Sequence, residues 1–297
     1  MDIEILGVLL AILSSLTISV ISLLIRKSTS EGSIEGTMLG ILLVNTVILV
    51  PFSLVYYFPE YKINVVSLLA FLASGFLATL LFRFLYYWGI NVIGASRAIS
   101  IKTSTPIFAT VLSVIFLNET LTIPHLLGIL LIVSGIILIS QGMSSEKRFT
   151  KKEGYLKAIV ITLLGAFILG VEKPITKVGL NQGTPPLVGI AIKVLFALLG
   201  VIIYLLIKDI SISGLFKTSA TRWYVFAGIA NSMGLVFIYT ALSISRVVVV
   251  VPILNTAPLV TLILSYIFTP KVEKITWKIA VSALAVVLGG ILITLYM

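Results

Sequence analysis

The sequence contains no cysteine, and charged residues make up only 11% of its 297 positions. Without thiols, the chain can form neither a disulfide framework nor a cysteine-ligated zinc site. Soluble proteins of this size are about half apolar and about a quarter charged. This chain is instead 59% hydrophobic, with a mean hydropathy of +1.19. The composition excludes a soluble enzyme and predicts an integral membrane protein.

Ten apolar runs are long enough to cross a bilayer, because a spanning helix needs about 20 apolar residues. They cover residues 3–25, 36–58, 65–91, 98–117, 123–141, 156–178, 184–207, 222–244, 247–269 and 275–296. The runs are continuous, whereas the strands of a membrane barrel alternate between apolar and polar residues. The expected fold is therefore all-α, with ten transmembrane helices.

The chain also contains an internal repeat. A polar, basic linker (142–155) separates five runs from five, and residues 102–116 (KTSTPIFATVLSVIF) align with residues 254–268 (LNTAPLVTLILSYIF). Tyr87 has a counterpart 152 residues later in Tyr239. Because each half has an odd number of runs, the halves enter the membrane in opposite orientations. The sequence thus predicts two inverted five-helix repeats, 1–141 and 156–297, around a central cavity, as in many secondary transporters.

The proline-centred segment TSTPIFATVLSVIFLNETLT, the run GILLIVSGIILI and their echoes in the second half resemble the paired EamA-type domains of the drug/metabolite transporter superfamily. The resemblance covers essentially the whole chain. It implies a ten-helix secondary transporter of small metabolites, often an exporter. The second half departs from the family pattern at TPKVEK, where extra residues precede Glu273.

The loop charges predict an orientation in the cell membrane. The net charge of +10 comes from basic residues placed between apolar runs, and these form no nucleic-acid-binding face. Most of the 21 Lys and Arg residues follow odd-numbered runs. Since such residues accumulate in cytoplasmic loops, both termini are expected outside the cell. The resemblance implies the opposite, because ten-helix relatives usually have cytoplasmic termini.

Four ionisable residues stand out within the runs: Arg83, Lys102, Glu172 and Lys193. Each costs roughly 2.5–3.5 kcal/mol to insert, which makes such residues functional candidates. From a rise of about 1.5 Å per residue, Arg83 and Lys102 are expected at one level, with Glu172 and Lys193 nearer the opposite surface. The four carry a net positive charge, which favours a ligand with a carboxylate or phosphate group.

Polar and aromatic residues share the predicted helix faces around these cations at spacings of three and four. The predicted substrate-binding residues are Thr79, Arg83, Tyr86, Tyr87, Lys102, Asn231, Tyr239 and Asn255. Alternatively, the charged ends of Arg83 and Lys102 extend along their long side chains to the lipid headgroups.

Glu172 and Lys193 form either a structural ion pair or a site that couples transport to an ion. Bends during alternating access are expected at four prolines, and the proline next to Glu172 is also expected to kink or end its helix. These predicted hinges are Pro106, Pro174, Pro252 and Pro258.

Other residues have structural interpretations. Gly128, Gly135 and the pair Gly289–Gly290 are expected to allow close helix packing. Glu119 and Glu273 precede the fifth and tenth runs and are expected to cap the helices that follow them. His125 is the only histidine, so no metal site is expected, and no cofactor is predicted.

The leading functional prediction is a secondary transporter of amino acids or related carboxylates, which works by alternating access as an exporter or exchanger. A phosphate-sugar or nucleotide-sugar exchanger is the second prediction, and a membrane-embedded lipid-handling protein the third. The sequence contains neither HExxH nor an ATP-binding P-loop motif, so neither zinc-protease chemistry nor direct ATP drive is expected. Substrate identity, direction and coupling ion remain open, as does the choice between monomer and homodimer.

Overall fold

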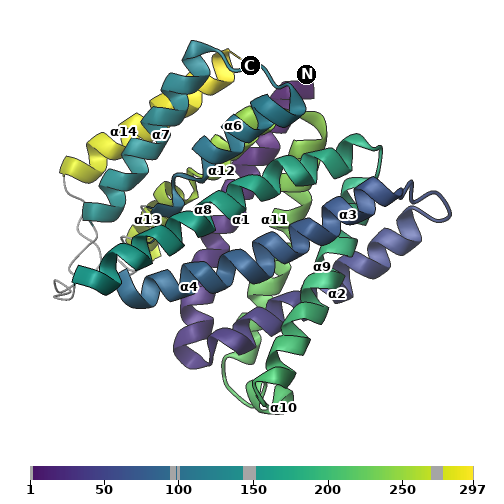
Figure 1. Cartoon of the computed structure of the whole chain (residues 1–297). Helices are drawn as coiled ribbons and strands as arrows, with labels where there is room; N and C mark the ends of the chain where they lie inside the picture. The colour runs from purple at the N-terminus through teal and green to yellow at the C-terminus, as the bar shows by residue number, and fades with distance from the viewer. Residues whose placement is uncertain (1–2, 94–97, 99–100, 143–151, 269–276, 297) are drawn as a thin grey trace.

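A computed structural model describes residues 3–93, 98, 101–142, 152–268 and 277–296, which are helical apart from short connections (Figure 1). The elements of the first half are α1 (Ile3–Glu31), α2 (Ile34–Tyr56), α3 (Val65–Ser74), the π-helix η1 (Gly75–Leu81), α4 (Phe82–Ile93), α6 (Thr105–Leu117) and α7 (Ile123–Gly142). Those of the second half are α8 (Lys152–Asn181), α9 (Pro186–Ile207), α10 (Ile212–Leu215), α11 (Thr221–Ile244), α12 (Val247–Leu254), α13 (Ala257–Phe268) and α14 (Trp277–Leu295).

Six helices in the described part of the chain are long and apolar enough to cross a membrane. They coincide with the first, second, third, sixth, seventh and eighth apolar runs of the sequence. Four shorter apolar helices, Thr105–Leu117, Ile123–Leu138, Val247–Thr261 and Val281–Leu295, occupy the remaining runs. The all-helical membrane fold is confirmed for the described residues, while the count of ten spans stays a prediction.

The fourth and ninth runs are interrupted at equivalent positions. The helical pattern changes to a turn at Thr103–Ser104 and again at Asn255–Thr256, 152 residues later. Pro106 and Pro258 then stand in the first turns of α6 and α13. A proline is favoured there because its missing N–H is not needed in the first helical turn. The interruptions thus precede these two predicted hinges.

The other two predicted hinges lie inside helices. Pro174 is within α8, and Pro252 is within α12. The expectation that Pro174 would end its helix is wrong, because α8 continues to Asn181. A proline is tolerated within a membrane helix where neighbouring helices support the backbone, and α8 packs against α3, α4 and α6.

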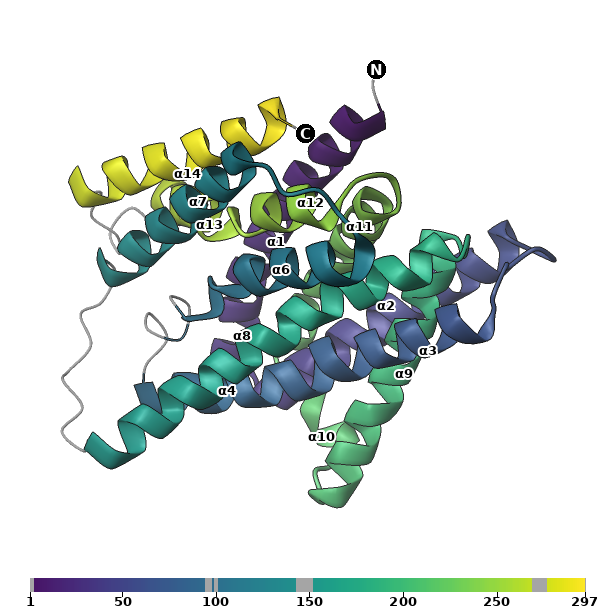
Figure 2. The same ribbon diagram turned by 45° about the horizontal axis from the view of Figure 1, so that its top comes forward.

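The two halves interlock. The most extensive packing joins α7 to α14 and α1 to α11, followed by α4 and α6 against α8, and α2 against α9 and α11. Exchanging the halves turns one set of contacts into the other: α1 packs on α11 and α13, as α8 packs on α4 and α6. Figures 1 and 2 show α7 and α14 side by side at one edge of the bundle. This exchange of contacts fits a two-repeat architecture.

Glycines allow α7 and α14 to approach at the backbone. A Cβ atom added to Gly128 would lie 2.7 Å from the carbonyl oxygen of Gly289, and one added to Gly135 would lie 2.7 Å from that of Ser282. Real Cβ atoms essentially never come so close to another atom. The close packing predicted from Gly128, Gly135 and Gly289 is therefore confirmed, whereas the prediction is wrong for Gly290, at which an added Cβ would meet nothing within 4 Å.

Glu119 joins the halves at another point. Its carboxylate accepts hydrogen bonds from the backbone N–H groups of Val247 (2.8 Å) and Val248 (2.9 Å) in the first turn of α12. The expectation that Glu119 caps the helix that follows it is wrong, because α6 and α12 pack together and bring a helix of the other half to its carboxylate. Its counterpart Glu273 lies outside the described residues.

Candidate functional site

A buried carboxylate stands at the centre of the candidate site. Glu172 of α8 has no solvent exposure, and its Oε1 accepts hydrogen bonds from Ser74 (2.5 Å), Thr176 (3.1 Å) and Lys193 (2.7 Å). Its Oε2 lies 2.7 Å from the Nζ of Lys173, without a well-directed hydrogen bond. Glu172 therefore contacts two ammonium groups, one from its own helix and one from α9. These charges can remain in the interior only because they are paired.

Tyr239 of α11 completes this buried cluster. Its hydroxyl lies 3.2 Å from the Oγ of Ser74, and the Nζ of Lys193 lies 5.3 Å from the centre of its ring. A cation over an aromatic face is stabilised by the ring's electron density. The cluster thus joins α3 of the first half to α8, α9 and α11 of the second half. It holds one carboxylate and two ammonium groups, and its net charge is positive.

Lys102 lies just before the first helix interruption, against aromatic rings of α4. Its Nζ is 5.6 Å from the ring centre of Tyr86 and 6.0 Å from that of Phe82, and these two rings stack on each other. No carboxylate among the described residues lies within ion-pair distance of Lys102, while Lys173 and Arg83 repel it electrostatically. Lys102 therefore places an ammonium group beside an apolar surface, and no described residue provides an acidic partner for it.

Each interruption is held by a helix from the other half. At the first, the Thr105 hydroxyl donates to the carbonyl of Lys102 (2.7 Å) and lies 3.3 Å from that of Ala166 in α8. At the second, the Thr256 hydroxyl lies 3.0 Å from that of Ser15 in α1. Asn255 donates to a carbonyl within α12 and is half-buried.

Other predicted site residues lie apart from these groups. Asn231 contacts Asn45 of α2 at 2.7 Å, and Asn45 also lies 3.0 Å from Ser232, so this polar contact joins α2 to α11. Thr79 is buried within η1. Tyr87 belongs to α4, but its side chain lies outside the described part of the structure.

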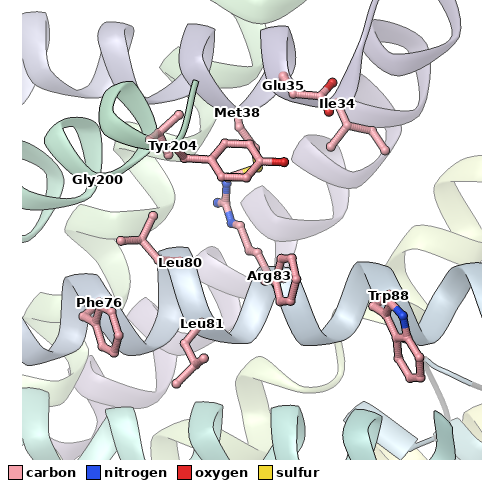
Figure 3. A pocket seen from close by; sticks show the side chains of 12 residues that line it. Ile34, Glu35, Met38, Phe76, Leu80, Leu81, Arg83, Trp88, Gly200 and Tyr204 are labelled. Carbon is pink, nitrogen blue, oxygen red and sulfur yellow. The ribbon is translucent and has the colours of Figure 1, made fainter. Parts of the chain in front are cut away.

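Arg83 faces a different space from Lys102. It lines a pocket of about 490 Å³ between α2, η1–α4 and α9, and Figure 3 shows its guanidinium group directed towards α2 beside Met38 and Tyr204. None of the other predicted substrate-binding residues lines this pocket. The predicted level of Arg83 therefore did not determine which helices it faces.

Sequence reasoning missed three residues of these clusters. Lys173 was not singled out with the other ionisable residues, although it follows Glu172 directly inside α8. Ser74 and Asn45 stand within apolar runs, and both are fully or almost fully buried. A polar residue inside a spanning run was the available signal, since such groups need internal partners.

Comparison with known proteins identifies the family. A model of the EamA-like transporter family matches residues 5–141 and, a second time, residues 156–295. A solved structure described only as "Crystal structure of protein" aligns with a TM-score of 0.78 at 15% identity, over 98% of this chain and 96% of that chain. At this identity, the likeness shows the fold alone.

A shorter match is found with the uncharacterized protein MJ1333.1 of Methanocaldococcus jannaschii, which is 41% identical over 56 residues. That match covers 19% of this chain and 41% of the relative, so the chain spans less than half the length of this curated relative. The family model, in contrast, covers nearly the whole sequence in two copies. The chain therefore belongs to the EamA-like transporter family, and its apolar helices make it a multi-pass membrane protein.

Proposed function

We propose that this protein is a secondary active transporter that exports or exchanges amino acids or related carboxylates by alternating access. The observation that carries the proposal is the pair of interrupted helices at positions 152 residues apart, each packed against a helix of the other half. Interrupted helices leave backbone polar groups available near the centre of a membrane, and transporters with inverted repeats bind substrates there. Two such inverted five-helix repeats, 1–141 and 156–297, would then move against each other around the site.

Lys102 is the proposed anchor for the substrate's anionic group. Its ammonium group has no carboxylate partner in the described structure and lies over the rings of Tyr86 and Phe82, which can pack an apolar substrate body. A single ammonium balances one carboxylate but only part of the charge of a phosphate ester. This balance favours amino acids over sugar phosphates. Asn255, at the second interruption, is proposed to supply a neutral hydrogen-bonding group.

Glu172 is the proposed coupling residue. It is the one carboxylate between Lys173 and Lys193 in the cluster that joins α3, α8, α9 and α11. Protonation of Glu172 would leave two neighbouring ammonium groups without their counter-charge, and their repulsion would loosen these helices. The alternative is a purely structural ion pair. Exchange driven by a pH gradient should therefore be lost in Glu172→Gln while substrate counterflow remains, and unchanged pH dependence would remove Glu172 from the coupling step.

Counterflow in proteoliposomes tests the transport proposal. Vesicles loaded with neutral amino acids, dicarboxylates or sugar phosphates are assayed for uptake of the matching labelled compound. We expect saturable amino-acid exchange that is lost in Lys102→Ala and retained in Lys208→Ala, which removes an exposed cation at the end of α9. Exchange of sugar phosphates alone would favour the second candidate function, whereas no exchange of any pool would refute the proposal.

We also propose that both termini lie outside the cell, on the basis of the loop charges. The absence of native cysteine allows single-cysteine labelling without background. An impermeant thiol reagent applied to intact cells should label Glu60→Cys, between α2 and α3, and spare Ser144→Cys in the central linker. The reverse pattern would place both termini in the cytoplasm.

A further inference from the structure

The pocket beside Arg83 opens sideways on the bundle. Phe84, Phe76 and Tyr204 line it and are also exposed on the outer surface, with 66%, 48% and 41% of their area accessible. Its inner wall includes Val201 of α9, which is buried. Because the exposed apolar surface of a membrane-spanning bundle faces lipid, the mouth of this pocket faces the bilayer. A ligand can therefore enter it without passing through the space between the repeats.

Two opposite charges line the pocket without neutralising each other. Arg83 comes from α4 and Glu35 from the first turn of α2. Neither forms a hydrogen bond or ion pair with another residue that the structure describes, so their charged atoms are more than 4 Å apart. An unpaired charge within the membrane, such as that of Arg83, is costly. A ligand that carries both an anionic and a cationic group would satisfy both side chains at once.

The polarity of the pocket follows the depth of the helices. Glu35 is the second residue of α2, and Tyr204 is one turn from the end of α9, so both lie near the same surface of the bundle. Gly200 is a turn deeper in α9, and Phe76 lies in η1, near the middle of the third apolar run. Figure 3 shows this gradient, with Phe76 and Gly200 at one end and Glu35 at the other. A membrane lipid has the same order, from a polar headgroup at the surface to an apolar chain within.

We propose that this pocket binds an amphipathic zwitterion, whose anionic group lies at Arg83, whose ammonium group lies at Glu35 and whose apolar part lies along Phe76 and Leu80. Guanidinium groups form strong paired hydrogen bonds with phosphate and carboxylate. The mouth facing the bilayer favours an ethanolamine phospholipid as the source. An apolar amino acid has the same charge pattern and would reach the site from water. The pocket shares none of its lining with the other residues proposed for transport, so it does not depend on the proposed substrate.

Lipid titration followed by native mass spectrometry tests this site in the full-length purified protein. Phosphatidylethanolamine should bind more tightly than phosphatidylglycerol, which carries no ammonium group. Arg83→Gln should weaken phosphatidylethanolamine binding by about tenfold or more, since a charged hydrogen bond is lost. Arg83→Lys, which keeps the charge, should retain most of the binding. Glu35→Gln should abolish the preference between the two lipids.

Arg26→Gln is the matched control, because it removes an exposed cation near the C-terminal end of α1, outside the pocket. Glu35→Gln provides a second test if Arg83→Gln does not fold. If leucine stabilises the folded protein only when Arg83 and Glu35 are both present, and no lipid is preferred, the site binds a zwitterion that enters from water. The proposal would be overturned if Arg83→Gln and Glu35→Gln both bound lipid and leucine as well as Arg26→Gln does.

Discussion

The contact between α7 and α14 allows a stability prediction with an internal control, because Gly289 and Gly290 are neighbours with opposite surroundings. A Cβ atom at Gly289 would lie 2.5 Å from the carbonyl oxygen of Gly128 and 2.9 Å from Ile132. A Cβ atom at Gly290 would meet nothing within 4 Å. Substitution of either glycine by alanine adds one methyl group. The two neighbouring positions on α14 therefore compare a packed site with an open one.

The magnitude follows from this geometry. Ordinary contact begins at 3.4 Å, so Gly289→Ala requires α7 and α14 to separate locally by about 0.9 Å. The obstacle is backbone rather than a flexible side chain, and overpacking of this kind costs typically 1–3 kcal/mol. Both substitutions gain about 0.8–1 kcal/mol of helix propensity. The difference between the two variants isolates the packing cost, and Gly290→Ala should be more stable than Gly289→Ala by about 1–3 kcal/mol.

Reversible unfolding in mixed detergent micelles, followed by circular dichroism, gives this difference as a change in the free energy of unfolding. The double variant Gly128→Ala/Gly289→Ala should cost less than the sum of the two single changes, because one separation of the helices relieves both clashes. Equal stability of Gly289→Ala and Gly290→Ala would show that α7 and α14 do not meet at this point, and the close-packing explanation would then be wrong.

Two further predictions concern the contacts that join the halves. Glu119→Ala should lower the free energy of unfolding by about 0.5–2 kcal/mol, because two N–H groups of α12 lose their acceptor; Glu60→Ala, which removes an exposed carboxylate, is the control, and equal effects would contradict the capping role. Lys193→Met should destabilise the protein by about 3–5 kcal/mol, since it removes one partner of a buried ion pair. Adding Glu172→Gln should restore part of that loss, whereas additive losses in the double variant would argue against the pairing.

The repeat could be recognised in the sequence because chemically distinctive residues occupy equivalent positions in the two halves. Leucine, isoleucine and valine match by chance in any two apolar runs, but Pro106 and Pro258 do not. The helix interruptions before these two prolines occur at the same spacing as the sequence match. The sequence did not predict the interruptions, since hydropathy measures whether a residue suits lipid and not how its backbone is bonded.

The surroundings of Arg83 could not be predicted for a structural reason. The common face of Thr79, Arg83 and Tyr86 was inferred from regular α-helical spacing. The structure instead has a π-helix at η1, which includes Thr79 and ends two residues before Arg83. A π-helix bonds each N–H to the carbonyl five residues earlier, so it changes the angle between the residues before it and those after it. No feature of an apolar run reveals this change.

Long-range partners were a second limit. Glu119 has the position of a cap for the helix that follows it, and only the packing of α6 on α12 brings Val247 and Val248 to its carboxylate. Lys173 likewise stands just before Pro174, where the helix was expected to kink or end. Since α8 continues through Pro174, Lys173 is held against the interior and contacts Glu172.

The two repeats share an architecture but differ in charge. At the spacing that aligns the interruptions, Lys102 corresponds to Leu254 and Arg83 corresponds to Leu235. The first interruption therefore has an ammonium group beside it, while the second has the amide of Asn255. Inverted repeats place similar elements on both sides of the substrate site, and a charge that only one repeat carries gives that site a single charged end. The proposed binding chemistry thus lies where the second repeat departs from the first.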